Sequence, residues 1–277
     1  MFKALVTTLL SSTLLISTAL PLQVQAKETV VSGSTSVARI MDVLAETYNQ
    51  SHPENFVAVQ GIDSTAGIVL AIKGVSDFGM SSRYLTEAEA EKQLTIVPIA
   101  YDGLTVATNV LNPVKNLSRE QLAKIYQGEI TNWKEVGGND QRIAVVTREA
   151  ASGSRASFES LLGLTKVVNN QTVSNINDKN LVVNSNGMMK TLINNNPQAI
   201  GFISMGSVDK SIKAIDVDGV SPTQENIANK KYKLSRPFLM VYKNDHLKTE
   251  AESFLKYVLS PEGQALIESY GYTSISH

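Results

Sequence analysis

Three short segments of this chain share one arrangement, in which a strand-like apolar run leads through small hydroxyl residues and glycine into a helix. They cover residues 32–36, 60–67 and 147–155. The first backbone N–H groups of a helix have no partner within the helix, and the helix dipole favours negative charge at that end. The arrangement therefore predicts an α/β chain in which several helix N-termini point at one bound anion.

The segment at residues 147–155 carries the strongest signal, since a predicted strand precedes it and a predicted helix follows it. Arg148 offers a planar fork of donors to an oxyanion. Ser152, Gly153 and Ser154 would lie where the helix begins. A plainer interpretation makes Ser152 an ordinary N-cap and Arg148 a surface ion-pair partner, because serine is a preferred N-cap in any helix.

The two other segments repeat the pattern nearer the N-terminus. Ser34, Thr35 and Ser36 lie in a Ser-Gly-Ser-Thr-Ser turn before a predicted helix, and Ser64 follows Asp63 at the start of another. Three hydroxyl-rich helix starts in one chain favour a shared anion over three unrelated caps.

Predicted strands and helices alternate along the rest of the chain, which indicates mainly parallel strand pairing. Predicted strands at 94–100 and 104–108 are joined by residues 101–103, and the second strand is a candidate for crossing into a second lobe. Residues 222–233 are predicted as a loop. Trp133, the only tryptophan, is predicted to anchor the packing of a nearby glycine turn.

Residues 1–26 have the composition of a secretory signal peptide, with one early lysine, an apolar run and a small-residue cleavage pattern that ends at Ala26. Cleavage would leave about 250 residues, enough for one large domain or two ordinary ones. The net charge of −1 gives no reason to expect a nucleic-acid partner. The chain has no cysteine, which excludes disulfides, thiolate metal sites and a lipid-modified cysteine. We therefore expect a periplasmic protein without a lipid anchor.

Together these segments resemble the phosphate-binding proteins of phosphate-specific ABC transporters, the PstS family. The resemblance rests on Arg148-(x)3-Ser152-Gly153-Ser154, Ser34-Thr35-Ser36 and the segment 60–64, and it extends to residues 77–81, 199–202 and 221–223. It implies a type II periplasmic binding protein fold, with two α/β lobes joined by two crossing strands and the ligand in the cleft. Lobe 1 would comprise residues 27–105 and 215–277, and lobe 2 residues 106–214.

The resemblance also implies a function and a site. The function is high-affinity extracytoplasmic binding of inorganic phosphate by a monomer, and delivery to membrane-embedded ABC permease subunits, with no catalysis and neither cofactor nor metal. The phosphate-binding residues that the match implies are Ser34, Thr35, Ser36, the amide of Val37, Ser64, Ser82, Arg148, Ser152, Gly153 and Ser154.

One of these positions departs from the family. Ser82 stands where the best-known members have an aspartate that accepts the proton of phosphate and repels sulfate. Two hypotheses stay open. Either Asp63 supplies the missing carboxylate, or Ser82 alone serves as the acceptor. In the second case the protein would discriminate poorly between phosphate and sulfate.

Other functions remain alternatives. A receptor for another tetrahedral oxyanion, such as sulfate or molybdate, fits the same pattern, because a fold does not fix its ligand. An enzyme is disfavoured, since the chain has three histidines and neither a Gly-x-Ser-x-Gly elbow nor a P-loop. An adhesive or structural role would explain export but none of the three helix starts. Arg39, Arg83 and Arg155 are predicted to form ion pairs rather than bind ligand.

Overall fold

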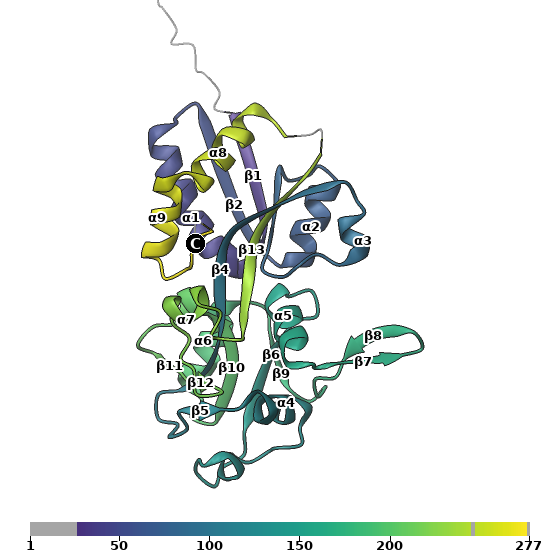
Figure 1. Ribbon diagram of the computed structural model, residues 1–277, viewed down its shortest axis with the longest axis vertical. Helices are drawn as coiled ribbons and strands as arrows, with labels where there is room; N and C mark the ends of the chain where they lie inside the picture. Colours follow the sequence, from purple (N-terminus) through teal and green to yellow (C-terminus); the bar gives the residue numbers. More distant parts are fainter. Residues whose placement is uncertain (1–26, 245–246, 276–277) are drawn as a thin grey trace, which may run out of the picture.

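Two groups of helices and strands lie one above the other along the long axis of the molecule and are joined by strands that run through both (Figure 1). This computed structural model describes residues 27–244 and 247–275, and the predicted signal peptide lies outside them. The joining strands are β4 (Leu94–Asn109) and β13 (Ser235–Lys243), which pair antiparallel. We call the upper group in Figure 1 the first lobe and the lower group the second lobe.

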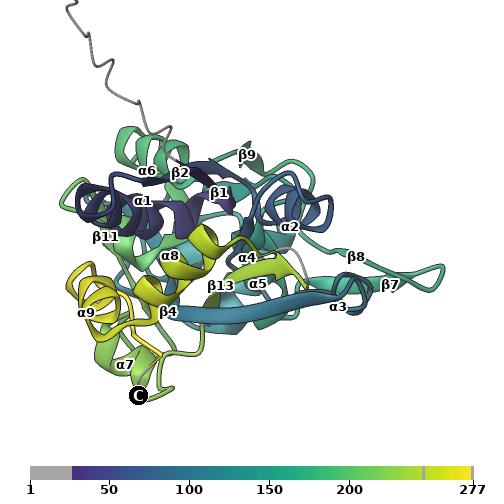
Figure 2. The same ribbon diagram turned by 90° about the horizontal axis from the view of Figure 1, so that it is seen from above.

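The first lobe is built from strands that alternate with helices. Seen from above, α1, α8 and α9 lie on one side of its strands and α2 with α3 on the other (Figure 2). The apolar residues of α1 recur at helical spacing and are fully buried at Val37, Ile40, Met41 and Leu44. Its elements are β1 (Lys27–Ser34), α1 (Thr35–Ser51), β2 (Asn55–Ile62), α2 (Ser64–Ile72), β3 (Phe78–Ser81), α3 (Glu87–Ala90), α8 (Thr249–Leu259) and α9 (Pro261–Ser269).

The second lobe has its own apolar core. Trp133 is buried there, and its side chain lies directly beneath Gly138, so the anchor role predicted for it is confirmed. The elements of this lobe are β5 (Asn116–Leu117), α4 (Arg119–Gln127), η1 (Trp133–Val136), β6 (Ala144–Arg148), α5 (Gly153–Leu162), β7 (Thr165–Val168), β8 (Gln171–Ser174), β9 (Leu181–Val183), α6 (Asn186–Asn195), β10 (Ala199–Ser204), η2 (Met205–Ser207), β11 (Ile212–Ala214), β12 (Asp216–Val217) and α7 (Gln224–Ala228).

One sheet path runs through both lobes in the order β2-β1-β3-β13-β4-β10-β6-β9. The outer strands pair in parallel, as β1 does with β2 and β3, and as β6 does with β10 and β9. The pairings that involve β4 and β13 are antiparallel. The carboxyl ends of β1, β2, β3 and β6 carry the predicted junctions, and a ligand site in an open α/β sheet lies at such strand ends.

The prediction of two separate strands joined by residues 101–103 is wrong, because β4 is continuous from Leu94 to Asn109. Asp-Gly is a common turn signal, but Asp102 lies opposite Arg236 in the antiparallel ladder and pairs with it. A buried carboxylate with an opposite charge beside it can remain within a strand. The predicted loop at 222–233 also contains a short helix, α7.

The extent of each lobe remains a proposal. Apolar side chains from residues 215–234 pack into the second core together with Leu104, at the point where β4 enters the second lobe. This packing supports a second lobe that includes residues 215–234 as well as the predicted 106–214. We infer that β13 is the strand on which the chain returns to the first lobe.

Gly67 gives a prediction for stability, because α2 crosses the sheet at this residue. A Cβ at Gly67 would lie 2.5 Å from the Cα of Gly33 and 2.7 Å from the carbonyl oxygen of Ser32, both backbone atoms. We expect Gly67→Ala to lower the free energy of unfolding by about 1–3 kcal/mol, as overpacking does. Gly187→Ala is the control, since the nearest heavy atom there lies 3.8 Å away. Urea denaturation in which both variants match the wild type would contradict this account of the packing.

Candidate anion-binding site

Serine side chains from both lobes meet between the strand ends. The hydroxyl of Ser36 in the first lobe lies 3.1 Å from that of Ser154 in the second. Within the first lobe, the Ser82 hydroxyl accepts a hydrogen bond from Ser34 at 2.9 Å and lies 3.4 Å from the Ser64 hydroxyl. The serines gathered here, each at most 3 % exposed, are Ser34, Ser36, Ser64, Ser82, Ser152 and Ser154. The predicted serines are therefore brought together.

The local sequence positions these hydroxyls by starting a helix at each junction. The Ser34 side chain accepts from the amides of Ser36 and Val37 as the N-cap of α1. Ser152 caps α5 in the same way and accepts from the amide of Arg155 at 3.3 Å, which is the N-cap role of the plainer interpretation. Ser64 is the first residue of α2. Three helix N-termini thus meet at one place, which favours negative charge there.

At Gly153 the backbone of the second lobe lies against side chains of the first lobe. A Cβ at this residue would lie 2.1 Å from the Ser64 hydroxyl and 2.7 Å from the Ser82 hydroxyl. Thr35, also predicted, is half-buried, and its hydroxyl lies 3.5 Å from the Asn186 amide nitrogen. Gly153 and Thr35 therefore lie where the lobes meet, and the Val37 amide donates to the Ser34 hydroxyl at the start of α1.

Arg148 is 2 % exposed at the end of β6 and is held from two sides. Its Nε and Nη2 donate to the two carboxylate oxygens of Glu149 at 2.9 and 2.7 Å, and also to the carbonyls of Val183 and Asn184. The hydrogen bonds that Arg148 makes within the described chain use these two nitrogens, which leaves Nη1 for a ligand. The ion pair expected in the plainer interpretation exists, but on a buried arginine rather than at the surface.

A second buried arginine, Arg236 on β13, was not predicted as a site residue. Its Nε and Nη2 donate to one carboxylate oxygen of Asp102 at 3.0 and 2.9 Å. Nη2 also donates to the Ser36 hydroxyl at 3.0 Å, and Nη1 donates to the Ser154 hydroxyl at 2.7 Å. Arg236 therefore contacts both members of the serine pair that bridges the lobes.

Burial and neighbouring charges shift the pKa values of Arg236 and Asp102. Burial lowers the pKa of the Arg236 guanidinium, the Asp102 carboxylate opposes this, and the charge of Arg148 adds to the lowering. Burial raises the pKa of the Asp102 carboxyl, and Arg236 opposes that shift. Guanidinium stays protonated in proteins, so we assign an ionised pair. Two buried guanidiniums, each paired with a carboxylate, thus lie in one dry region, where they can donate charged hydrogen bonds to an anion.

Asn186 was not predicted as a site residue either, and it reaches across the lobes. Its Nδ2 donates to the Ser36 hydroxyl at 2.8 Å from the first turn of α6. Asn186 and Arg236 meet Ser36 only through the tertiary fold, since they lie 150 and 200 residues from it in sequence. The one available signal was an arginine beside Pro237 at the start of an apolar strand.

The remaining arginines behave as predicted where the structure shows their partners. Arg83 forms a bidentate pair with Glu89, at 2.7 Å for both bonds. Arg155 pairs with Glu159 at 2.8 Å. Arg39 is exposed. Asp63 accepts from the amide of Ala66 at 2.7 Å as the N-cap of α2, so its carboxylate is used by its own helix.

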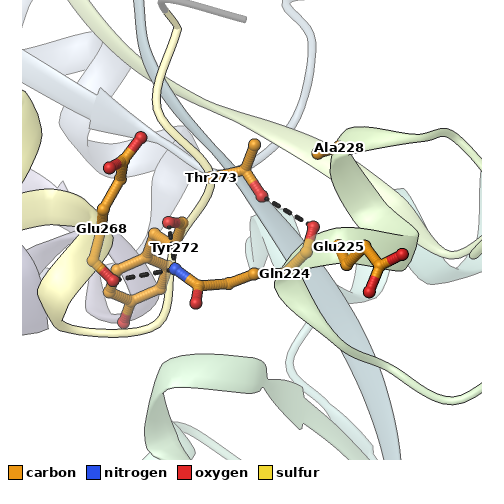
Figure 3. A pocket seen from close by; sticks show the side chains of 6 residues that line it. All are labelled: Gln224, Glu225, Ala228, Glu268, Tyr272 and Thr273. Atoms are coloured by element: carbon orange, nitrogen blue, oxygen red, sulfur yellow. Dashed lines mark hydrogen bonds between the residues drawn. The ribbon is translucent and has the colours of Figure 1, made fainter.

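A cavity of about 270 Å³ lies elsewhere, between α7, α9 and the segment that follows α9 (Figure 3). The amide of Gln224 crosses it and donates to the carbonyls of Glu268 and Tyr272, both at 2.8 Å (Figure 3). Its lining includes Glu225 and Glu268 and no basic residue, which disfavours an anion. Among residues 27–244 and 247–275, no group of three or more His, Cys, Asp and Glu residues could hold a metal ion, and no helix has the length and apolarity to cross a membrane.

Comparison with known proteins identifies the family of this chain. Residues 22–262 match the family model of the PBP superfamily domain, and the two-lobed α/β architecture is the type II periplasmic binding protein fold. The chain is 32% identical over 257 residues to the phosphate-binding protein PstS of Borreliella burgdorferi, covering 91% of this chain and 92% of that protein. The chain belongs to the PstS family of phosphate-binding proteins.

Two solved structures are also similar. An ABC-type phosphate transport receptor from Vibrio cholerae is 59% identical, with a TM-score of 0.74, and the match covers 88% of this chain and 99% of that one. A putative phosphate ABC transporter substrate-binding protein from Clostridium perfringens, solved with bound phosphate, is 41% identical, with a TM-score of 0.85 and coverage of 90% and 100%.

Proposed function

We propose that this protein binds one inorganic phosphate between its lobes and delivers it to an ABC-type phosphate importer. The observation that carries the proposal is the buried meeting of serine hydroxyls from both lobes, Ser36 with Ser154, beside two buried guanidiniums. A dry site with hydroxyl donors, helix N-termini and paired cations is the chemistry that an oxyanion requires. The names of the relatives, which specify phosphate, agree with it.

The proposed ligands divide by lobe. Hydroxyls and amides of the first lobe would bind one side of the anion, and the α5 junction with Arg148 the other, so that binding draws the lobes together. The set is Ser34, Thr35, Ser36, Val37, Ser64, Ser82, Arg148, Ser152, Gly153 and Ser154. Ser152 accepts as the cap of its helix and so would have its own proton left to donate. Ser34 donates its proton to Ser82, so it would have to exchange that bond for one to the anion.

The cellular role follows the family. The relatives are named as binding proteins and transport receptors rather than enzymes, and a receptor of this kind works outside the cytoplasm. We propose a periplasmic monomer, released by cleavage after Ala26, that docks on membrane-embedded permease subunits and has no catalytic residue.

Thermal unfolding with added anions tests the proposal. A ligand that binds the folded state raises the melting temperature with the logarithm of its concentration over Kd. We expect phosphate to do this and to reduce the scattering radius. A shift with sulfate or molybdate but not with phosphate would establish the alternative oxyanion receptor, and no response to any of them would refute an oxyanion site.

Ser82 gives a prediction about selectivity. Since Asp63 caps its own helix, we favour the hypothesis that Ser82 acts without a nearby carboxylate. Its hydroxyl can accept a hydrogen bond from a protonated phosphate but carries no charge to repel sulfate. Ser82→Asp should raise the phosphate-over-sulfate affinity ratio, and Asp63→Asn, which keeps a capping oxygen, should leave that ratio unchanged. Competition binding at mildly acidic and mildly alkaline pH measures both ratios. A sharp fall in the phosphate-over-sulfate affinity ratio for Asp63→Asn would show instead that Asp63 supplies the missing carboxylate.

A further inference from the structure

The two strands that join the lobes carry a buried ion pair between Asp102 and Arg236. We propose that Arg236 is a second guanidinium that binds the phosphate, and that Asp102 is the residue that positions it. This inference rests on the proposed function. It adds to the predicted site a ligand that belongs to neither the first-lobe junctions nor the α5 junction.

The carboxylate of Asp102 is engaged on all sides. One oxygen accepts from Nε and Nη2 of Arg236, and the other accepts from the Ser204 hydroxyl at 2.9 Å and the Met205 amide at 3.1 Å. The two residues face each other directly in the β4–β13 ladder, with side chains 0 % and 1 % exposed. Asp102 therefore fixes one edge of the guanidinium and is saturated as an acceptor.

The other edge of the guanidinium faces the serines. Nη2 reaches the Ser36 hydroxyl and Nη1 the Ser154 hydroxyl, at the starts of α1 and α5. A hydroxyl that accepts a hydrogen bond still has its own proton to donate. One of these two protons is used in the hydrogen bond between Ser36 and Ser154, and the other is left to donate. Nη1 also donates to the Ser82 carbonyl, at 3.4 Å. An anion that takes the remaining hydroxyl proton therefore lies next to the guanidinium, and it would replace one of the present hydrogen bonds of the Nη atoms.

The stability of the fold gives no adequate reason for this pair. A buried ion pair seldom stabilises a protein more than apolar residues of the same volume. The next residues of β13, from Phe238 to Val241, are apolar and buried, so a further apolar side chain would suit position 236. Arg148 also lies near enough to disfavour the charge on Arg236. A bound anion would remove that conflict.

The position on the crossing strands has a consequence for closure. Arg236 contacts a first-lobe hydroxyl and a second-lobe hydroxyl from a strand that belongs to both. The positive charge of Arg236 would then already be in place on a joining strand when phosphate arrives, and the lobes would close around the phosphate.

The test uses variants that keep the site neutral. The double variant Asp102→Asn with Arg236→Gln removes both charges and keeps polar groups, so no carboxylate is left buried alone. We expect about 30-fold or more loss of phosphate affinity by titration calorimetry, as for truncation of a buried charge partner. Arg236→Lys keeps the charge and loses the fork, and should weaken binding by about tenfold. Arg119→Gln is the matched control, because Arg119 forms an exposed pair with Asp218.

Asp102→Asn alone separates positioning from simple charge. It removes one negative charge, which makes the net charge of the site more positive by one. Phosphate affinity would therefore rise if Asp102 only repelled the anion. If Asp102 positions Arg236, affinity should fall. In this test the wild type and Arg119→Gln should both bind phosphate. If the double variant and Arg236→Lys then bind it with wild-type affinity, the inference is overturned and the proposed function stands. A wild type that does not bind phosphate would overturn both. A crystal structure with phosphate should show Nη1 or Nη2 of Arg236 within hydrogen-bond distance of a phosphate oxygen.

Discussion

Arg148→Ala is expected to weaken phosphate binding by on the order of 2–5 kcal/mol, the cost of truncating one partner of a buried charge pair. Arg148 is 2 % exposed, and Glu149 and two backbone carbonyls hold its guanidinium in place. Its loss would also leave Glu149 without this partner near the anion. Arg148→Lys should cost less, because an ammonium keeps the charge but meets one oxygen where the fork meets two. Titration calorimetry with phosphate measures both losses.

Arg155 is the control for Arg148. It lies seven residues further along and pairs with Glu159, while its Nη1 donates to the backbone carbonyl of Arg148. Arg155→Ala should therefore cost far less binding energy than Arg148→Ala. If Arg155→Ala loses more phosphate-binding energy than Arg148→Ala, then Arg148 is not the main cation that binds the phosphate.

Gly153→Ala is expected to lower phosphate affinity by holding the lobes apart. The added methyl group would fall 2.1 Å from the Ser64 hydroxyl and 2.8 Å from the Ser64 Cβ, in the opposite lobe. The lobes meet closely here, since the Ser157 hydroxyl also donates to the carbonyl of Ser82 at 3.0 Å. Overpacking costs about 1–3 kcal/mol, which corresponds to roughly a five- to 150-fold loss of affinity.

Gly187→Ala adds the same methyl group to α6, where the nearest heavy atom lies 3.8 Å away. It should bind phosphate as the wild type does. Small-angle scattering of Gly153→Ala with saturating phosphate should show a larger radius than the wild type with phosphate. Equal radii and equal affinities for Gly153→Ala and wild type would show that the lobes do not meet at Gly153.

The parts of the site that the sequence predicts are those set by neighbours in the chain. A hydroxyl residue at a helix start is a local pattern, so the sequence alone predicts the positions of Ser34, Ser64 and Ser152 at the first turns of their helices. The alternation of strands and helices predicts the α/β class for the same reason. Both depend on interactions only a few residues apart.

The parts that the sequence does not predict depend on contacts between distant segments. Asp102 followed by glycine has the local pattern of a turn, and only pairing with Arg236, 134 residues away, keeps it inside a strand. Asn186 likewise contacts Ser36 only because the lobes meet. The start of β13 at Ser235 and the packing of residues 215–234 in the second core are tertiary outcomes of the same kind.

Calorimetric titration of phosphate into protein stripped of ligand by unfolding and refolding tests the central claim most directly. The account predicts one phosphate per chain for the wild type, with binding greatly weakened in Arg148→Ala and retained in Gly187→Ala. A wild type that refolds to its native circular dichroism spectrum and takes up no phosphate would contradict it.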